Sequence, residues 1–228
     1  GEKLGWERPN WFAEKAEVAR DIYTFERPNW HVPVGREHKA AREAAVLLDQ
    51  SSFAKFVLQG PDAEAALQWI AANRVDKPVG SIIYTQMLND QGGIECDVTC
   101  VRTGHDSYYI VTGTGFATHD FDWIRRNIPD GMNAQLVDVT SSNAVLSLFG
   151  PKARNILSAA TRADVSNEAQ PFATALQISI AGCPDLALRI TYVGELGWEL
   201  HLPTEYALSV YNALQDAGAE HGLRNAGY

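Results

Sequence analysis

Two carboxylates and a hydroxyl alternate with apolar residues in "YTQMLNDQGGIECDVTC", residues 84 to 100. This period of two predicts a strand. Glu95, Asp97 and Thr99 would share its polar face, and the apolar residues would face a core: Ile94, Cys96, Val98 and Cys100. Carboxylates on such a face can take up a proton or stabilise a cation in a reaction, or they can simply face water, as most acids do. The residue pattern leaves both interpretations open.

A second candidate lies in "TYVGELGWELHLP", residues 191 to 203, where polar residues alternate with Trp198, Leu200 and Leu202. Gly194 and Gly197 predict a tight turn, which would place Tyr192 and Glu199 opposite each other across a hairpin. The alternative is an ordinary exposed face on which Glu199 is solvated.

The sequence gives little support for other common catalytic or metal-binding motifs. The six histidines include no pair spaced four residues apart, and "HDFD" (119 to 122) is typical of the first turn of a helix. The three cysteines form no CxxC pattern, so neither a disulfide framework nor a metal site is predicted. Walker, nucleophile-elbow, HExxH and dinucleotide-binding motifs are absent.

An internal echo indicates how the candidate residues are positioned. "FVLQGPDAEAAL" (56 to 67) resembles "LSLFGPKARNIL" (146 to 157), and each reads as a strand, then Gly-Pro, then a helix. Pro61 and Pro151 suit the first helical turn, where a missing N–H has no consequence. The echo predicts two related lobes.

The remaining periodicity predicts an α+β fold with mostly antiparallel sheet. A hairpin joins 94–100 to 107–112, a helix follows from Ala117, and Thr204 can cap a final helix. Three further strands are predicted at 175–180, 186–193 and 198–202. We expect an opening segment and first helix over 1–50, a first α+β lobe over 51–140 and a second over 141–228. The opening segment repeats "ERPNW" and should pack through Trp6, Trp11 and Trp30.

Composition narrows the class of ligand. The chain has 228 residues, a formal net charge of −9 and a pI near 5.1, which argues against nucleic-acid and anionic-membrane partners and favours a small ligand. No apolar run approaches the ~20 residues that span a bilayer. We expect a reducing compartment: the cytoplasm in a bacterium, or the mitochondrial matrix in a eukaryote.

Taken together, these segments resemble the folate-binding domain of the glycine-cleavage T-protein (aminomethyltransferase) superfamily. "GWERPNWF", "VGREHKAAREAAVLLDQSSFAKF" and "GPDAEAAL" are more closely similar to the dimethylglycine and sarcosine dehydrogenase branch. T-proteins place two adjacent aspartates where this chain has Cys96 and Asp97, and that departure also favours the dehydrogenase branch. The similarity covers essentially the whole chain.

The resemblance implies two intertwined α+β lobes with mostly antiparallel sheets and flanking helices, the aminomethyltransferase folate-binding fold. It also implies a C-terminal barrel beyond "GLRNAGY" and a flavin domain upstream, both outside this sequence. By resemblance, Asp97 matches the acid near N5 of tetrahydrofolate, Glu199 the carboxylate that holds the pterin edge, and Tyr192 the aromatic residue beside the ring.

The implied reaction joins an iminium methylene, derived from an N-methyl amine, to tetrahydrofolate as 5,10-methylenetetrahydrofolate. The implied cofactor is tetrahydrofolate, with FAD only in the upstream domain, and the implied partners are folate, an N-methylated amine and the flavin domain in cis. Two alternatives stay open: a stand-alone T-protein-like aminomethyltransferase or folate-dependent demethylase, and a folate-binding module without catalysis.

Overall fold

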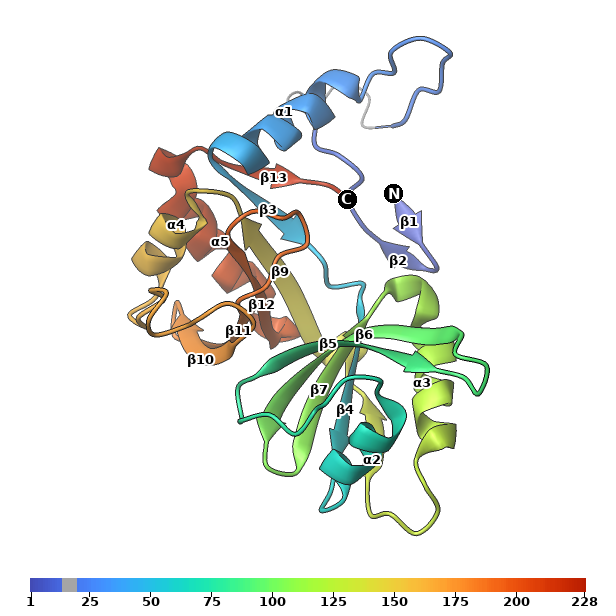
Figure 1. The fold of residues 1–228 in the computed structure, drawn as a ribbon. Coiled ribbons are helices and arrows are strands. Elements are labelled where there is room, and N and C mark those ends of the chain that lie inside the picture. The colour runs from blue at the N-terminus through green and yellow to red at the C-terminus, as the bar shows by residue number, and fades with distance from the viewer. Residues whose placement is uncertain (14–19) are drawn as a thin grey trace. The chain divides into compact units, whose positions relative to one another are not determined.

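A computed structural model describes residues 1–13 and 20–228 of the protein (Figure 1). The chain divides into two compact units. The first comprises Gly1–Gln50, Ala144–Phe172 and Gln177–Tyr228, and the second comprises Ser51–Asn143 and Ala173–Leu176. Both contain helices and a mixed or antiparallel sheet, so the predicted α+β class is confirmed. The described residues contain no closed barrel.

The second unit is a five-stranded antiparallel sheet with helices on one face. Its strand order is β5-β6-β7-β4-β8. The strands are β4 (Ala54–Gln59), β5 (Ile82–Leu88), β6 (Ile94–Gly104), β7 (Ser107–Thr112) and β8 (Gln135–Asp138). Helices α2 (Ala63–Ile70) and α3 (Ala117–Asn127) bury their apolar sides against the same face of this sheet, where Leu67 and Ile124 meet Phe56 and Cys96 in one core. The other face therefore carries the remaining side chains of β5 and β6.

Strand β6 confirms the predicted alternation over most of its length, since Cys96, Val98 and Cys100 are buried. The prediction for Ile94 is wrong, because its side chain is 67% exposed. The register shifts between Met87 and Leu88: Met87 pairs with Cys96, whereas Leu88 pairs with Ile94. Glu95 is thus the extra residue of a β-bulge, and a bulge reverses which face the preceding residues occupy.

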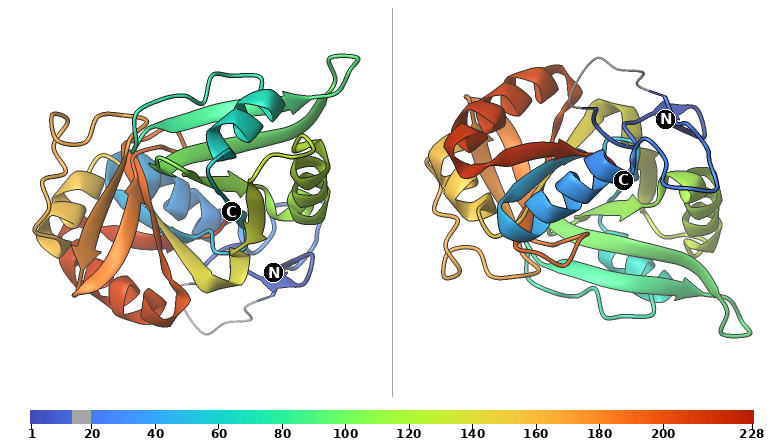
Figure 2. Two further views of the ribbon diagram at one scale, coloured as in Figure 1. Left: turned by 90° about the horizontal axis from the view of Figure 1, so that it is seen from below. Right: turned by 90° about the horizontal axis from the view of Figure 1, so that it is seen from above.

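The first unit contains a six-stranded sheet in the order β10-β11-β12-β9-β3-β13 and a small β1-β2 hairpin. The strands are β1 (Glu2–Lys3), β2 (Trp6–Glu7), β3 (Ala45–Asp49), β9 (Asn143–Phe149), β10 (Ala175–Ile180), β11 (Cys183–Leu188), β12 (Gly197–Pro203) and β13 (Leu223–Ala226). The helices are α1 (His31–Glu43), α4 (Ala153–Ala160) and α5 (Ala207–Gly218). Figure 2 shows α1 lying along β3 and β13.

Residues 1–50 belong to the same unit as most of 144–228, whereas the sequence pattern predicts an opening segment separate from the second lobe. The reason is strand pairing. β3 lies between β9, with which it is antiparallel, and β13, with which it is parallel. The end of the first 50 residues is therefore an interior strand of the six-stranded sheet.

The two Gly-Pro turns of the internal echo have the same backbone conformation. Gly60 and Gly150 have φ of +135° and +129°, a region that favours glycine. A Cβ at Gly60 would lie 2.3 Å from the carbonyl oxygen of Asn133, and one at Gly150 would lie 2.5 Å from that of Ala44. Both glycines therefore combine a left-handed backbone with a close backbone contact.

The prolines of these turns lie outside the helices that follow. The sequence predicts that Pro61 and Pro151 lie in the first helical turn. This prediction is wrong, because helix α2 begins at Ala63 and α4 at Ala153, two residues after each proline. Each proline instead follows a glycine whose N–H takes part in a backbone hydrogen bond. The helix starts are set two residues later than the motif suggested.

Replacing Gly150 with alanine should lower the free energy of unfolding by about 3 kcal/mol, because the new methyl group meets backbone atoms and the backbone angle is strained. The matched control is Gly35→Ala in α1, where a Cβ meets nothing within 4 Å. That change should raise the stability by up to about 1 kcal/mol, since alanine is the better helix former. Urea unfolding of both variants measures the difference, and equal effects would contradict the account of the turn.

Two further elements differ from their predicted bounds. Strand β11 begins at Cys183, inside the predicted turn, and ends at Leu188, well short of 193. Helix α5 begins at Ala207 after a 3-10 turn over Thr204–Tyr206, so Thr204 is not its N-cap.

Trp6, Trp11 and Trp30 of the opening segment are half-buried.

A buried carboxylate on α1 ties the two ends of the first unit together. Oε1 of Glu37 accepts a hydrogen bond of 2.7 Å from the backbone N–H of Phe12, and Oε2 accepts one of 3.1 Å from that of Gly227. A Cβ at Gly227 would overlap the backbone of Asn10 and Trp11. The opening segment is therefore held by α1 and by the last strand.

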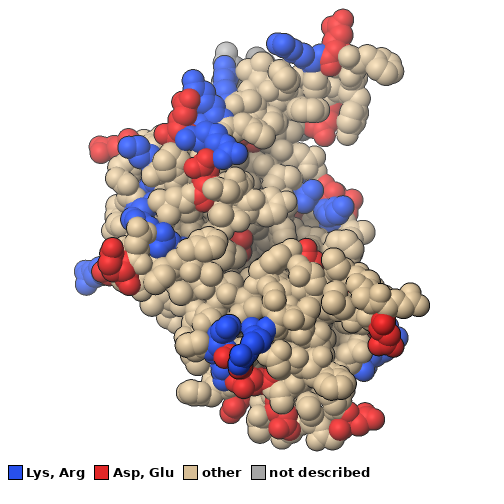
Figure 3. All heavy atoms as spheres, in the orientation of Figure 1, with Lys and Arg blue, Asp and Glu red and all other residues tan. Residues whose placement is uncertain are grey.

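On the face drawn in Figure 3, lysine and arginine are interspersed with aspartate and glutamate. None of the described helices is long and apolar enough to cross a membrane.

Candidate functional site

Asp97 lies exposed on the face of the five-stranded sheet that the helices leave uncovered. The β5–β6 register places Gln86 directly opposite Asp97, and Tyr84 opposite Thr99. The hydroxyl of Tyr84 donates to Oδ2 of Asp97 at 2.8 Å, and Nε2 of Gln86 donates to Oδ1 at 3.1 Å. Two donors on a neighbouring strand therefore fix the orientation of an exposed carboxylate.

The two donors are residues that the sequence analysis missed. Tyr84 and Gln86 alternate with the buried Thr85 and Met87, and that period of two was the available signal. The hydrogen bond to Asp97, followed by burial, raises the pKa of Tyr84, so its hydroxyl stays protonated and remains a donor. Its side chain is 60% exposed, as a residue that meets a ligand needs to be.

Glu95 does not join this group, although the simple alternation placed it beside Asp97. Its Oε1 accepts a 2.8 Å hydrogen bond from Nδ2 of Asn89, and its Oε2 lies 3.4 Å from Nε2 of His119. The bulge at Glu95 accounts for this different direction. A hydrogen bond to Asp120, with Glu95 nearby, raises the pKa of His119. Of the two acids in the motif, only Asp97 is held by Tyr84 and Gln86.

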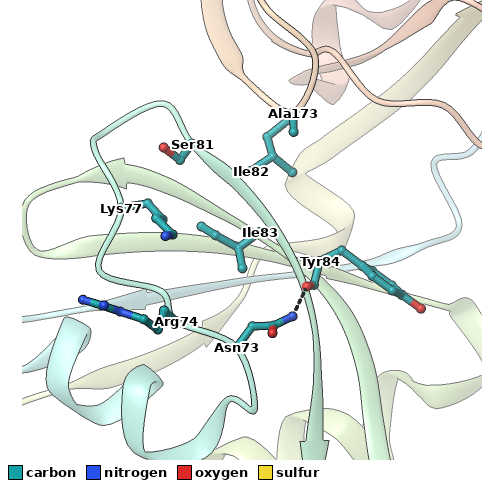
Figure 4. A pocket seen from close by; sticks show the side chains of 8 residues that line it. All are labelled: Asn73, Arg74, Lys77, Ser81, Ile82, Ile83, Tyr84 and Ala173. Carbon is teal, nitrogen blue, oxygen red and sulfur yellow. Dashed lines mark hydrogen bonds between the residues drawn. The ribbon is translucent and has the colours of Figure 1, made fainter.

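A shallow hollow of about 530 Å³ lies along the outer strand β5 of the same unit. Figure 4 shows Lys77 and Arg74 on one side of it and the ring of Tyr84 directed away from them. Arg74 forms an ion pair with Asp76, and Nδ2 of Asn73 donates to the backbone oxygen of Tyr84 at 2.8 Å. Tyr84 thus lines the hollow and also contacts Asp97, while the cationic side chains suit an anionic group.

Glu199 lies in the interior of β12 in the first unit. Its register partner on β11 is Leu188, its side chain is 13% exposed, and its Oε2 lies 3.4 Å from Nε2 of the buried His201. The neighbouring Trp198 is fully buried and donates from Nε1 to Oε1 of Gln170 at 2.8 Å. The alternative interpretation, in which Glu199 is a solvated acid on an exposed face, is therefore wrong.

Tyr192 does not lie across a hairpin from Glu199, which corrects the sequence-based prediction. β11 ends at Leu188, and Tyr192 follows in the loop 189–196 with its side chain 58% exposed. Its ring meets that of Tyr228 edge-on, with the centroids 6.1 Å apart. The structure places Tyr192 and Glu199 in the first unit and Asp97 in the second.

The comparisons with known proteins show the family of the chain. A family model described as the GCVT N-terminal domain matches residues 1–228. The chain is 38% identical to mitochondrial sarcosine dehydrogenase of Mus musculus, over 100% of the chain and 29% of that protein. It is 40% identical to 4-methylaminobutanoate oxidase (formaldehyde-forming) of Paenarthrobacter nicotinovorans, over 100% of the chain and 28% of that protein. The chain therefore spans less than a third of these relatives.

A solved structure shares the fold. The glycine cleavage system aminomethyltransferase T from Bartonella henselae matches with a TM-score of 0.74 and 24% identity, covering 86% of this chain and 51% of that one. The predicted aminomethyltransferase fold is thereby confirmed, and the sarcosine dehydrogenase match confirms the branch to which the motifs pointed.

Proposed function

Because the chain belongs to the GCVT N-terminal domain family, we propose that it binds tetrahydrofolate and captures a one-carbon unit from an N-methyl amine. The products are 5,10-methylenetetrahydrofolate and the demethylated amine, which leaves as its bond to the transferred carbon breaks. Oxidation of the amine is assigned to a flavin domain in the same polypeptide, in keeping with the mouse sarcosine dehydrogenase relative, which is more than three times as long as this chain.

The observation that carries this proposal is the Asp97 carboxylate, exposed on β6 and oriented by Tyr84 and Gln86. Tetrahydrofolate, when bound, supplies the nucleophilic nitrogen N5 for attack on the electrophilic carbon. Asp97 stabilises the positive charge of the incoming iminium group and accepts the proton that leaves the nitrogen. Its two donors hold it in place, so no reorientation is needed during the reaction.

Glu199 is assigned to the pterin edge, and Tyr192 to the ring face. A pterin presents an N–H and an amino group side by side, and a carboxylate can accept both hydrogen bonds in parallel. The low exposure of Glu199 strengthens such bonds, because water competes less for a half-buried carboxylate. The ring of Tyr192 is exposed, and we assign it a stacking contact with the pterin.

Replacing Glu199 with alanine should weaken tetrahydrofolate binding about 100-fold, because two hydrogen bonds to a charged acceptor are lost. Anaerobic calorimetric titration of the 228-residue chain measures the dissociation constant. Glu205→Ala, an exposed acid just after β12, is the matched control and should leave it unchanged. Saturable binding that is identical in both variants would refute the role of Glu199, and no binding by the unsubstituted chain would refute the proposed ligand.

A second candidate function is release of the one-carbon unit as formaldehyde, without folate. It is favoured by the name of the relative from Paenarthrobacter nicotinovorans, a formaldehyde-forming oxidase. The same titration separates the two candidates, since only the folate-dependent one requires a tetrahydrofolate site that depends on Glu199.

A further inference from the structure

Three side chains of different metal-ligating types meet between β6 and the first turn of α3. Sγ of Cys96, a ring nitrogen of His119 and a carboxylate oxygen of Asp120 lie within 4.8 Å of one another. Cys96 and Asp120 are buried, whereas His119 is half exposed. The proposed folate chemistry uses none of these three residues.

The donor spacing suits a small divalent cation. Zinc binds thiolate, imidazole and carboxylate at ~2.0–2.3 Å in tetrahedral geometry, so its ligand atoms lie roughly 3–4 Å apart. Nδ1 of His119 is already 2.9 Å from Oδ1 of Asp120, and the other separations, which are at most 4.8 Å, need to shorten by about 1 to 2 Å. A thiolate in the set favours zinc over magnesium or calcium, which prefer oxygen ligands alone.

Two neighbouring residues orient these donors by hydrogen bonding, as residues just outside the ligands of a metal site usually do. Oε2 of Glu95 lies 3.4 Å from Nε2 of His119, where it can accept that N–H while Nδ1, on the side of Asp120, binds a metal in place of its proton. A carboxylate on the distal nitrogen of a metal-binding histidine is a recurrent arrangement. The hydroxyl of Thr112 donates to Oδ2 of Asp120 at 2.6 Å, and this hydrogen bond orients the Asp120 carboxylate. Glu95 and Thr112 thus each contact one donor of the cluster from outside it.

We propose that Cys96, His119 and Asp120 form a zinc site, with Glu95 as the residue that positions the imidazole. Binding replaces two protons with the metal, the thiol proton of Cys96 and the proton of the hydrogen bond between Nδ1 of His119 and Asp120, and releases both to solvent. The half-exposed side of His119 gives the ion access, and three protein ligands leave one position for water. The site ties the start of α3 to the strand that carries Asp97.

The test is an anaerobic titration of the metal-stripped 228-residue chain with CoCl₂, followed by ZnCl₂ and without folate. We expect one equivalent of Co²⁺ to produce visible d–d bands and a thiolate-to-cobalt charge-transfer band, which Zn²⁺ then abolishes. Cys96→Ser should remove the charge-transfer band. His119→Gln should lower the affinity at least tenfold, and Glu95→Gln by about tenfold to 100-fold.

Cys100→Ser is the matched control, because Cys100 is buried on the same face of β6 but lies outside the cluster. It should leave the cobalt spectrum and affinity unchanged. Absence of a charge-transfer band in the unsubstituted chain, or its persistence in folded Cys96→Ser, would overturn the proposal. If Cys96→Ser does not fold, His119→Gln decides, since an unchanged affinity in that variant excludes the site.

Discussion

Replacing Asp97 with alanine should lower methylene transfer to tetrahydrofolate by about 10² to 10⁴-fold, the usual contribution of a positioned general base. The dissociation constant for tetrahydrofolate should stay within tenfold, because the proposed function assigns Asp97 to the reacting carbon and nitrogen and Glu199 to the pterin. Asp97→Asn should be similarly impaired, since it keeps the shape and removes the charge. Tyr84 and Gln86 would then face a neutral partner.

The measurement uses the proposed full-length protein with its flavin domain. The methyl carbon of the amine is isotopically labelled, and the fraction recovered as 5,10-methylenetetrahydrofolate is determined with a formaldehyde scavenger present. The scavenger removes freely diffusing formaldehyde, so only capture within the protein is counted. The rate of amine oxidation is an internal reference and should not change.

Asp90→Ala is the matched control for Asp97, because Asp90 is an exposed acid in the turn between β5 and β6. It should leave both transfer and binding unaltered. Two results would be inconsistent with the role given to Asp97: unchanged capture in Asp97→Ala, or a loss of binding as large as the loss of transfer.

The second large effect concerns a buried carboxyl group far from this chemistry in sequence. Asp185 in β11 is 1% exposed. Its Oδ2 accepts a 3.1 Å hydrogen bond from the backbone N–H of Ile180, whereas its Oδ1 is buried and has no hydrogen-bond partner among the described residues. Burial raises the pKa of Asp185 from 3.8 to about 7, because the charged form is poorly solvated there.

A carboxyl group whose pKa is higher in the folded state binds a proton more tightly there than in the unfolded chain. Its contribution to stability is complete below pH 3.8 and is lost as the pH rises to about 7. From the ~1.4 kcal/mol that corresponds to one pH unit, the loss amounts to about 4 kcal/mol. Asparagine does not titrate, so Asp185→Asn should abolish this part of the pH dependence.

The experiment compares the free energy of unfolding of the two proteins by urea between pH 4 and pH 8. We expect the free energy of unfolding of the variant to rise by about 4 kcal/mol relative to that of the unsubstituted chain as the pH rises. Any constant effect of the amide group cancels in this comparison. Asp164→Asn is the control, since hydrogen bonds from Ser166 lower the pKa of that exposed acid and its effect should be small and of opposite sign. A pH-independent difference for Asp185→Asn would exclude the mechanism.

Local sequence patterns were enough to predict the buried residues of β6 and the two strand-turn-helix units. The period of two in β6 identified Cys96, Val98 and Cys100 as buried, and the Gly-Pro echo identified two strand-turn-helix units. Both signals arise within a few consecutive residues, because side-chain direction in a strand and the conformation at a glycine are local properties. The motifs also indicated the family that the GCVT model match confirms.

Only the tertiary structure decided which side chains meet. The bulge at Glu95 exposes Ile94 and separates Glu95 from Asp97, and it depends on pairing with β5. The end of β11 at Leu188 removes Tyr192 from the hairpin, and the packing of α3 brings Asp120 beside Cys96. Register and helix docking are set by contacts between residues far apart along the chain, so no short stretch of sequence contains them. The sequence thus indicated the family, most of the strands and helices and the candidate acids, whereas the pairing of the strands set which residues are their neighbours.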